Sequence, residues 1–400
     1  MRLCTLHLLY LLLSGASLQF CHAQVSTVGP LPAVEAAFVD SLETDPVRVP
    51  SQVIVPREPQ HDSPASGDGK TAAAAELIRP QRGSYFALPP WQSVRFAPGS
   101  APGNDPARVI LSNDPERVAL PRLLSRTALR PGERTHFMWH HLSEYRPGMN
   151  LVVRLRNPGP TPAVVDMVAA HGGPSPDEIW VGHVIMRRFL GGWMNGQGFQ
   201  ARIGPGDVYE LSRRWFPHGS VVGGMADMCL VEGSQVVLES LTLQDWRWPA
   251  SLDSVRGLVA APIPPPLELP GVRTVGISHQ VGKAWQFATV GKNMEFKDHP
   301  ALRGDYGVVY KARVTFENPE RRRARLEIAF RAGGGVARGA VVVNGAIQET
   351  GLLNMGMEHI VYEDRGSTAP VTRVELRLIP QAGSNYPVSL VARSVLNPTQ

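Results

Sequence analysis

The chain partly repeats itself, and this constrains its fold more than any other feature of the sequence. When residues 151–173 are aligned with residues 312–334, the Asn157-Pro158 pair falls on Asn318-Pro319, and both segments end in a Gly-Gly pair. Apolar and polar residues alternate between these pairs with a period of two, which is typical of strands. The pattern predicts two strands joined by a turn, a β-hairpin, in each copy. It therefore predicts two related β-rich domains in tandem.

The Asn-Pro pairs have a structural role in this interpretation. Asn tolerates left-handed backbone and can close a turn with its side chain, while Pro fixes φ. We therefore assign Asn157, Pro158, Asn318 and Pro319 as turn residues.

Composition supports the same fold class. The 400 residues include 39 Gly and 36 Pro, which favours short strands and many turns over long helices. A later similarity, between residues 210–220 and residues 375–384, occurs in the same order in both copies. We predict an all-β chain with two tandem Ig-like β-sandwich domains and a disordered N-terminal segment.

Changes in composition along the chain predict its boundaries. The polar, non-periodic N-terminal region is typical of a disordered leader, and a Pro-rich run is typical of a stiff, extended connector. The predicted segments are a signal peptide (1–23), a leader (24–84), a first β-sandwich (85–258), a Pro-rich linker (259–271) and a second β-sandwich (272–396).

The N-terminus resembles a secretory signal. Arg2 supplies a positive charge, Leu8–Leu13 an apolar stretch, and Ala23 a small residue before the expected cut. Lipidation of Cys21 is disfavoured because Phe20 is too large for the usual small residue. No later stretch reaches the roughly 18 apolar residues that span a bilayer. We expect an extracytoplasmic protein, either secreted, periplasmic or at the cell surface, without a transmembrane segment after the signal.

The charge pattern argues against nucleic acid as a partner. The net charge is +5, but the basic residues are mostly Arg, lack interleaved aromatic residues and match no nucleic-acid-binding motif. If Cys4 and Cys21 leave with the signal, Cys229 is alone and cannot form an internal disulfide, so we interpret it as an inert, buried thiol.

One segment resembles a known family. Gly304-Asp305-Tyr306-Gly307, a following strand and then Asn318-Pro319 resemble a family of secreted bacterial proteins of unknown function, best populated in cyanobacteria. Its members carry Asn where this chain has Asp305. The resemblance implies a secreted, envelope-associated protein, and it brings no activity and no catalytic residues.

A histidine cluster raises the alternative of a metal site. In a strand, His136 and His140 would share one face and His141 would lie on the other. Histidines spaced in this way can bind Cu or Zn through their ring nitrogens. The favoured interpretation is that they hydrogen-bond to backbone and that the protein holds no cofactor.

An aromatic, Gly-rich insert raises the alternative of a sugar site. Trp180, Trp193, Phe199 and Trp215 could present flat rings to a glycan. The other interpretation is that they fill a core or an interdomain contact, because aromatic side chains bury large areas.

Catalytic patterns are weak. The chain has no GxSxG motif, so no nucleophilic Ser can be named. Asp166 and Glu327 hold equivalent positions in the two copies, and we expect both to face solvent. The sequence predicts a non-enzymatic secreted or cell-envelope protein with a structural or interaction role. Its partner would be an envelope component, a polysaccharide or another protein. The alternatives are a glycan-binding module and a Cu- or Zn-binding protein or enzyme.

Overall fold

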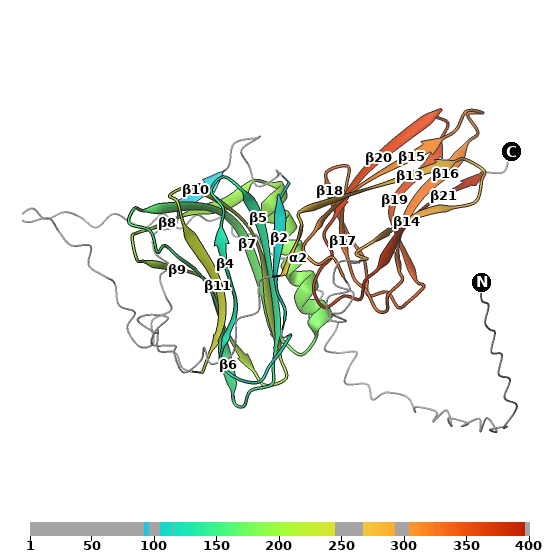
Figure 1. Ribbon diagram of the computed structural model, residues 1–400. Coiled ribbons are helices and arrows are strands. Elements are labelled where there is room, and N and C mark those ends of the chain that lie inside the picture. Colours follow the sequence, from blue (N-terminus) through green and yellow to red (C-terminus); the bar gives the residue numbers. More distant parts are fainter. Residues whose placement is uncertain (1–91, 96–104, 115, 245–266, 293–303, 397–400) are drawn as a thin grey trace, which may run out of the picture. The chain divides into compact units, whose positions relative to one another are not determined.

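The computed structural model describes residues 92–95, 105–114, 116–244, 267–292 and 304–396, all within one compact unit that spans residues 79–400. The predicted signal peptide and leader, and residues 259–266 of the predicted linker, lie outside these ranges. The described part is mostly β-strand with a single helix, α2 (Glu178–Met194), as expected of an all-β chain (Figure 1). No helix within these ranges is long and apolar enough to cross a membrane.

The first β-sandwich consists of two facing sheets. Phe137 and Val165 of the larger sheet share one core with Leu151, Val153 and Leu238 of the smaller sheet. The larger sheet has the order β1-β8-β7-β10-β5-β2-β12, with β3 beside β5, and the smaller has the order β4-β11-β6-β9. The larger sheet contains β1 (Gln92–Arg95), β2 (Arg108–Ser112), β3 (Arg117–Val118), β5 (Arg134–Ser143), β7 (Ala163–Ser175), β8 (Gln197–Ile203), β10 (Val221–Glu232) and β12 (Leu267–Pro270). The smaller contains β4 (Leu123–Leu129), β6 (Gly148–Arg156), β9 (Val208–Pro217) and β11 (Val236–Leu243).

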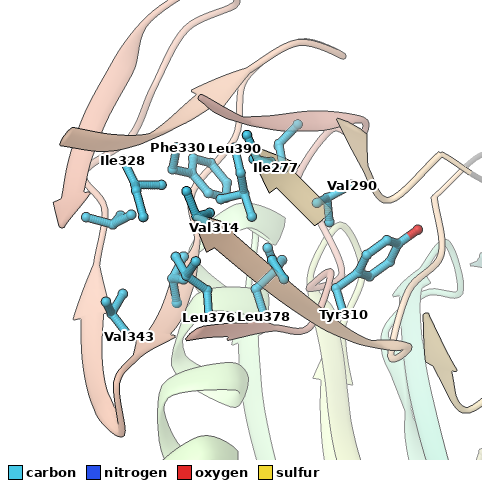
Figure 2. Packing of buried hydrophobic residues seen from close by; sticks show 14 of the residues in the cluster. Ile277, Val290, Tyr310, Val314, Ile328, Phe330, Val343, Leu376, Leu378 and Leu390 are labelled. Carbon is cyan, nitrogen blue, oxygen red and sulfur yellow. The ribbon is translucent and has the colours of Figure 1, made fainter. Parts of the chain in front are cut away.

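The second β-sandwich is built in the same way. Its core joins Val314 and Leu376 of a five-stranded sheet to Ile328, Phe330 and Leu390 of a four-stranded sheet (Figure 2). The sheet orders are β13-β15-β20-β17-β18 and β14-β21-β16-β19. The five-stranded sheet contains β13 (Val272–Gln280), β15 (Val309–Glu317), β17 (Ala340–Val343), β18 (Ala346–Glu349) and β20 (Val371–Leu378). The four-stranded sheet contains β14 (Gln286–Val290), β16 (Ala324–Ala332), β19 (Glu358–Ser367) and β21 (Val388–Leu396).

Strand pairing in the second sandwich is nested. β14 pairs with β21, β15 with β20, β16 with β19 and β17 with β18, all antiparallel. This is one long hairpin rolled up into two sheets, which is the arrangement of a jelly roll. The predicted Ig-like strand order is therefore not observed. Period-two patterning marks the buried face of each strand, but it does not say which distant strand lies alongside.

The first sandwich repeats this nesting and ends it differently. β5 pairs with β10, β6 with β9 and β7 with β8. The sequence similarity matches β6–β7 with β15–β16 and β9 with β20, but in the nested pairing β6–β9 corresponds to β16–β19, so the sequence alignment is displaced by one strand. The innermost pair is β17–β18 in the second sandwich and β7–β8 in the first, and the first carries α2 between the two strands of this pair. The two copies therefore share their nested strands and differ at the tip of the rolled hairpin.

The Asn-Pro pairs lie at corners between sheets, so the predicted hairpins are wrong. β6 and β15 belong to one sheet of their sandwich, and the strands that follow them, β7 and β16, belong to the facing sheet. Asn157 Nδ2 donates to the Thr161 carbonyl at 2.7 Å, and Asn318 Nδ2 donates to the Arg322 carbonyl at 2.8 Å. Both Asn side chains are buried. The same contact, four residues along the chain, closes the corner in each copy.

The connection between the sandwiches is short. The last residues of the predicted linker form β12, which pairs with β2 at the edge of the large sheet. Only Gly271 separates β12 from β13, which belongs to the second sandwich. The Gly271 carbonyl accepts a hydrogen bond from Val309 N at 2.9 Å. One residue between two paired strands leaves little freedom for one sandwich to move against the other.

We expect Asn318→Ala to lower the free energy of unfolding by about 1–3 kcal/mol, because the corner loses two hydrogen bonds to Arg322 and leaves buried groups unpaired. Urea denaturation followed by circular dichroism measures the change. Asn354→Ala, at an exposed position, is the matched control and should change stability by less than about 0.5 kcal/mol. Equal stability of the two variants would show that the Asn318 side chain does not hold the corner.

Candidate functional site

Helix α2 covers the outer face of the large sheet. Asp177 caps it, since its carboxylate accepts a hydrogen bond from Trp180 N at 2.9 Å. Val181, Ile185, Phe189 and Trp193 recur every four residues and are buried against β7 and β10. The aromatic insert predicted from the sequence is thus largely a helix. Because its Gly191-Gly192 pair lowers helix propensity, the sequence did not indicate a helix here.

The same helix contacts the second sandwich, in a region that we call the seam. A Cβ atom at Gly182 would overlap the Ala382 carbonyl oxygen, and one at Gly383 would overlap the Glu178 carbonyl oxygen. Backbone therefore packs directly on backbone between α2 and residues 380–383. The Glu349 carboxylate adds a hydrogen bond with His183 Nε2 at 2.8 Å and an ion pair with Arg187 Nε at 3.0 Å.

A cavity of about 250 Å³ lies at the seam beside this contact. The first sandwich contributes β5 together with Leu111, Asn113 and Glu116, α2 contributes its first turn, and the second sandwich contributes Tyr306 and residues 382–385. Its lining consists of Leu111, Asn113, Glu116, Met138, His140, Glu178, Tyr306, Ala382, Gly383, Ser384 and Asn385. Concave sites that collect polar groups from several elements are where ligands usually bind.

Titratable groups in the cavity have shifted pKa values. Burial raises the pKa of Glu116, and burial together with the nearby Glu116 charge raises the pKa of Glu178. Burial lowers the pKa of His140 to about 4, so the ring is neutral at pH 7. Burial raises the pKa of Tyr306 to about 12, with smaller contributions from Glu116 and Glu178. Glu116, Glu178 and Tyr306 line the same cavity, so the carboxylate charges raise the pKa values of their neighbours Glu178 and Tyr306.

The structure separates the histidines proposed as a metal site. His140 lines the cavity, while His136 lies deeper on the same face and contacts the Gly307 carbonyl through Nδ1 at 3.0 Å. His141 points into the core of the first sandwich, with Nε2 3.0 Å from Ser112 Oγ. Among the described residues, no group of three or more His, Cys, Asp or Glu side chains is arranged to hold a metal ion.

A buried acid–base cluster lies under α2, and the sequence pattern did not predict it. Asp227 accepts from Arg134 Nη1 at 2.7 Å and from Trp193 Nε1 at 3.2 Å, and its other oxygen lies 3.9 Å from His136 Nε2. Burial raises the pKa of Asp227 to about 7, although Arg134 opposes this shift. Burial lowers the pKa of His136 to about 4. The available signal was an Asp inside the otherwise apolar strand segment 225–230.

The aromatic residues proposed for sugar binding do not form one platform. Trp193 is fully buried under α2, and Trp180 is exposed at the other end of the helix. Phe199 packs against the core of the first sandwich from β8, while Trp215 lies on β9 in the opposite sheet. The helix and the two sheets thus carry these rings to different places.

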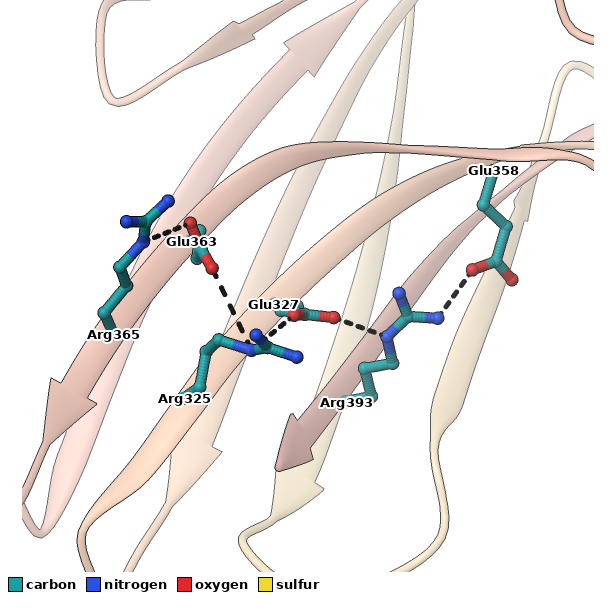
Figure 3. A network of polar contacts seen from close by, with 6 residues as sticks. All are labelled: Arg325, Glu327, Glu358, Glu363, Arg365 and Arg393. Carbon is teal, nitrogen blue, oxygen red and sulfur yellow. Dashed lines mark hydrogen bonds and ion pairs between the residues drawn. The ribbon is translucent and has the colours of Figure 1, made fainter. Parts of the chain in front are cut away.

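Glu327 is buried, so the predicted exposure of this residue is wrong. Its side chain is 2% exposed and forms ion pairs with Arg393 Nε at 2.6 Å and Arg325 Nε at 2.7 Å (Figure 3). Asp166, which the sequence alignment matches with Glu327, is partly exposed and accepts from Gln200 Nε2 at 2.8 Å. Alternation assigned both residues to the outer face of a sheet. It could not show that two Arg side chains cover Glu327 there.

Cys229 is a free thiol on β10, and it is partly exposed rather than buried as predicted. Burial raises its pKa, with Asp166 and Asp227 adding to the shift and Arg134 opposing it. A raised pKa keeps the thiol protonated, which disfavours nucleophilic chemistry at this residue.

Comparisons with known proteins identify no relative. A scan against protein-family profiles finds no match, and neither does a search of curated proteins. Among solved structures, the chain is similar to the PBSX exported protein XepA, with 9% identity over 78% of this chain and 99% of that one, at a TM-score of 0.15. It is also similar to Lac15 from a marine microbial metagenome, with 14% identity over 73% of this chain and 63% of that one, at a TM-score of 0.15. Scores this low carry no argument about fold or function.

Two glycines of α2 test the seam contact. Gly182→Ala should lower the free energy of unfolding by about 1–3 kcal/mol, because the new methyl group overlaps the Ala382 carbonyl. Gly191→Ala, with no atom within 4 Å of the added Cβ, should raise it by about 0.5–1 kcal/mol, because Ala favours a helix interior. Urea denaturation measures both variants. A stabilising Gly182→Ala substitution would contradict the contact.

Asp227 should make stability depend on pH. Its folded pKa of about 7 lies above the ordinary value of 3.8, so its contribution to stability is complete below pH 4 and is lost as pH rises to 7. We therefore expect Asp227→Asn to gain stability relative to the wild type between pH 4 and pH 7.5. Urea denaturation at a series of pH values measures the difference, and Asp114→Asn, at an exposed position, controls for net charge. His136 titrates in both proteins with the opposite sign. If the difference in free energy of unfolding between Asp227→Asn and the wild type stayed constant across this range, a raised pKa for Asp227 would be ruled out.

Proposed function

We propose that this chain is a non-enzymatic protein of the cell exterior or envelope that acts by binding, with the seam cavity as its ligand site. The observation that carries the proposal is the shared lining of this cavity. Met138 and His140 come from the first sandwich, Glu178 from α2, and Tyr306 and Ser384 from the second sandwich. Such a site exists only while the two sandwiches are held together.

The arrangement of the seam supports binding without a large rearrangement. Backbone packing at Gly182 and Gly383, and the single residue between β12 and β13, hold the walls of the cavity in place. A preformed site loses little conformational entropy when a ligand enters, so more of the contact energy appears as affinity. The polar side chains of the lining suit a small polar ligand.

Location outside the cytoplasm rests on the N-terminal sequence. Arg2, the Leu8–Leu13 stretch and Ala23 have the order of a secretory signal. Partners in this proposal are therefore envelope components, polysaccharides or other exported proteins.

Glycan binding at a second place is the other candidate, and one observation favours it. Trp285 and Phe287 are 50% and 55% exposed, and their ring centroids lie 5.5 Å apart beside and on the edge strand β14. Exposed aromatic rings offer flat apolar surfaces that suit the faces of sugar rings. These are not the aromatic residues that the sequence pattern singled out.

One NMR experiment separates the two sites. A small polar ligand of the cavity should shift the methyl resonance of Met138 and leave the 71% exposed Met355 unchanged. Asn113→Trp, which fills the cavity from a partly exposed position, should abolish the shift while the protein stays folded. Polysaccharide binding at Trp285 should quench Trp fluorescence, leave Met138 unchanged and be lost in Trp285→Ala. If a collection of envelope-derived small molecules and polysaccharides moves neither signal, binding at both sites is ruled out.

A further inference from the structure

The cavity offers hydrogen-bond acceptors that have no partner in the protein. The Nε2 atom of His140 and the Oδ1 atom of Asn113 are buried and make no hydrogen bond. His140 itself is only 4% exposed, and its Nδ1 lies 3.9 Å from the Glu116 carboxylate. An Nδ1–H group facing that carboxylate leaves Nε2 as the acceptor of a neutral ring. Unpaired buried acceptors are costly, and a ligand that donates hydrogen bonds would satisfy them.

The hydroxyl donors of the cavity are already used. Tyr306 OH donates to the Ser384 carbonyl at 3.3 Å, and Ser384 Oγ donates to the Arg338 carbonyl at 3.0 Å. The amide of Asn385 is also engaged, since Nδ2 donates to the Val336 carbonyl at 3.0 Å. The lining therefore has two unpaired hydrogen-bond acceptors, at His140 and Asn113, while its hydroxyl groups and the Asn385 amide already donate within the protein.

The charge of the cavity has the same sign throughout. Glu116 and Glu178 are its two charged side chains, and no Lys or Arg is among the described residues that line it. Arg117, whose charge opposes the raised pKa of both carboxylates, is 66% exposed and pairs with Glu144 at 3.1 Å. Each carboxylate has a raised pKa, and the pKa of Glu178 is raised further by Glu116. A positive ligand would relieve this repulsion, whereas an anion would add to it.

We propose, on the basis of the proposed binding function, that the seam cavity takes a small organic cation whose ammonium or guanidinium group donates hydrogen bonds to Glu116 and Glu178. Met138, Leu111 and Ala382 supply apolar wall for the carbon skeleton. The charged group belongs either to a free amine, such as an amino sugar, or to the side chain of a basic residue in a peptide.

Binding of this kind depends on pH and on salt. The cation competes with protons for the carboxylates, so affinity rises as pH increases through their raised pKa values. It falls with ionic strength because the Glu116 side chain is 40% exposed and Glu178 is exposed, so salt screens both carboxylates. The titratable and charged groups that face them are His140, Asp177, Arg117 and Tyr306.

The test uses the Met138 methyl resonance of the full chain. Glucosamine, methylguanidine and Nα-acetyl-lysine amide, whose side-chain ammonium group is free, are the cationic probes. N-acetylglucosamine and glucose are neutral counterparts of the amino sugar. We expect the cations to bind and the neutral sugars to bind at least about tenfold more weakly. Glu116→Gln and Glu178→Gln should each weaken cation binding by about tenfold. Glu375→Gln, an exposed residue of the second sandwich, makes the same change in net charge and should have no effect.

The outcomes separate this inference from the proposed function. Equal binding of glucosamine and N-acetylglucosamine, unchanged in Glu116→Gln and Glu178→Gln, would overturn the cationic ligand and leave the cavity as a binding site. Failure of every probe to shift Met138 would count against both. Preference for glucosamine over acetyl-lysine amide identifies a free amine as the source of the charge, and the reverse preference identifies a basic side chain.

Discussion

Direct backbone packing between α2 and residues 380–383 is the contact on which the rest of the seam depends. Only a residue without Cβ lets the helix approach the Ala382 carbonyl at Gly182, and the same holds for Gly383 against the Glu178 carbonyl. This approach brings Glu178 beside Tyr306 and places Glu349 within reach of His183. Moving the helix outward by one methyl group would open the cavity and disrupt these polar contacts together.

The site arises where the two copies of the repeat differ. Both copies roll a hairpin with the same nested pairing, and the Asn157 and Asn318 side chains make the same contact at corners that lie one strand apart in that pairing. At the tip of the roll the second copy joins β17 directly to β18, whereas the first inserts α2 between β7 and β8. The helix covers an apolar sheet face and meets Val309, Ala340 and Val342 of the second copy with its other side. The shared strands form the scaffold, and the unlike tips form the contact.

Carboxylates differ in how fully they are paired. Glu239 and Glu327 are buried carboxylates that each contact two Arg side chains, so their charge is compensated locally (Figure 3 shows Glu327). Asp227 has a single Arg partner under α2, and its pKa is raised to about 7. Glu116 and Glu178 have no Lys or Arg partner among the described residues that line the cavity. A carboxylate with two Arg partners keeps its charge and stabilises the fold, whereas a carboxylate with fewer partners can still bind a proton or a cationic ligand.

By itself, the sequence determined the mostly β fold class and the presence of turns at the two Asn-Pro pairs. These follow from local patterning, because strand alternation and Asn-Pro chemistry act over a few residues. Only the tertiary structure decided the nested strand order, the burial of Glu327 and the cavity at the seam. Its lining residues, such as Glu116, Glu178 and Tyr306, are distant in the chain and belong to different elements. Their proximity depends on how a helix packs against a distant loop, and no local pattern encodes that contact.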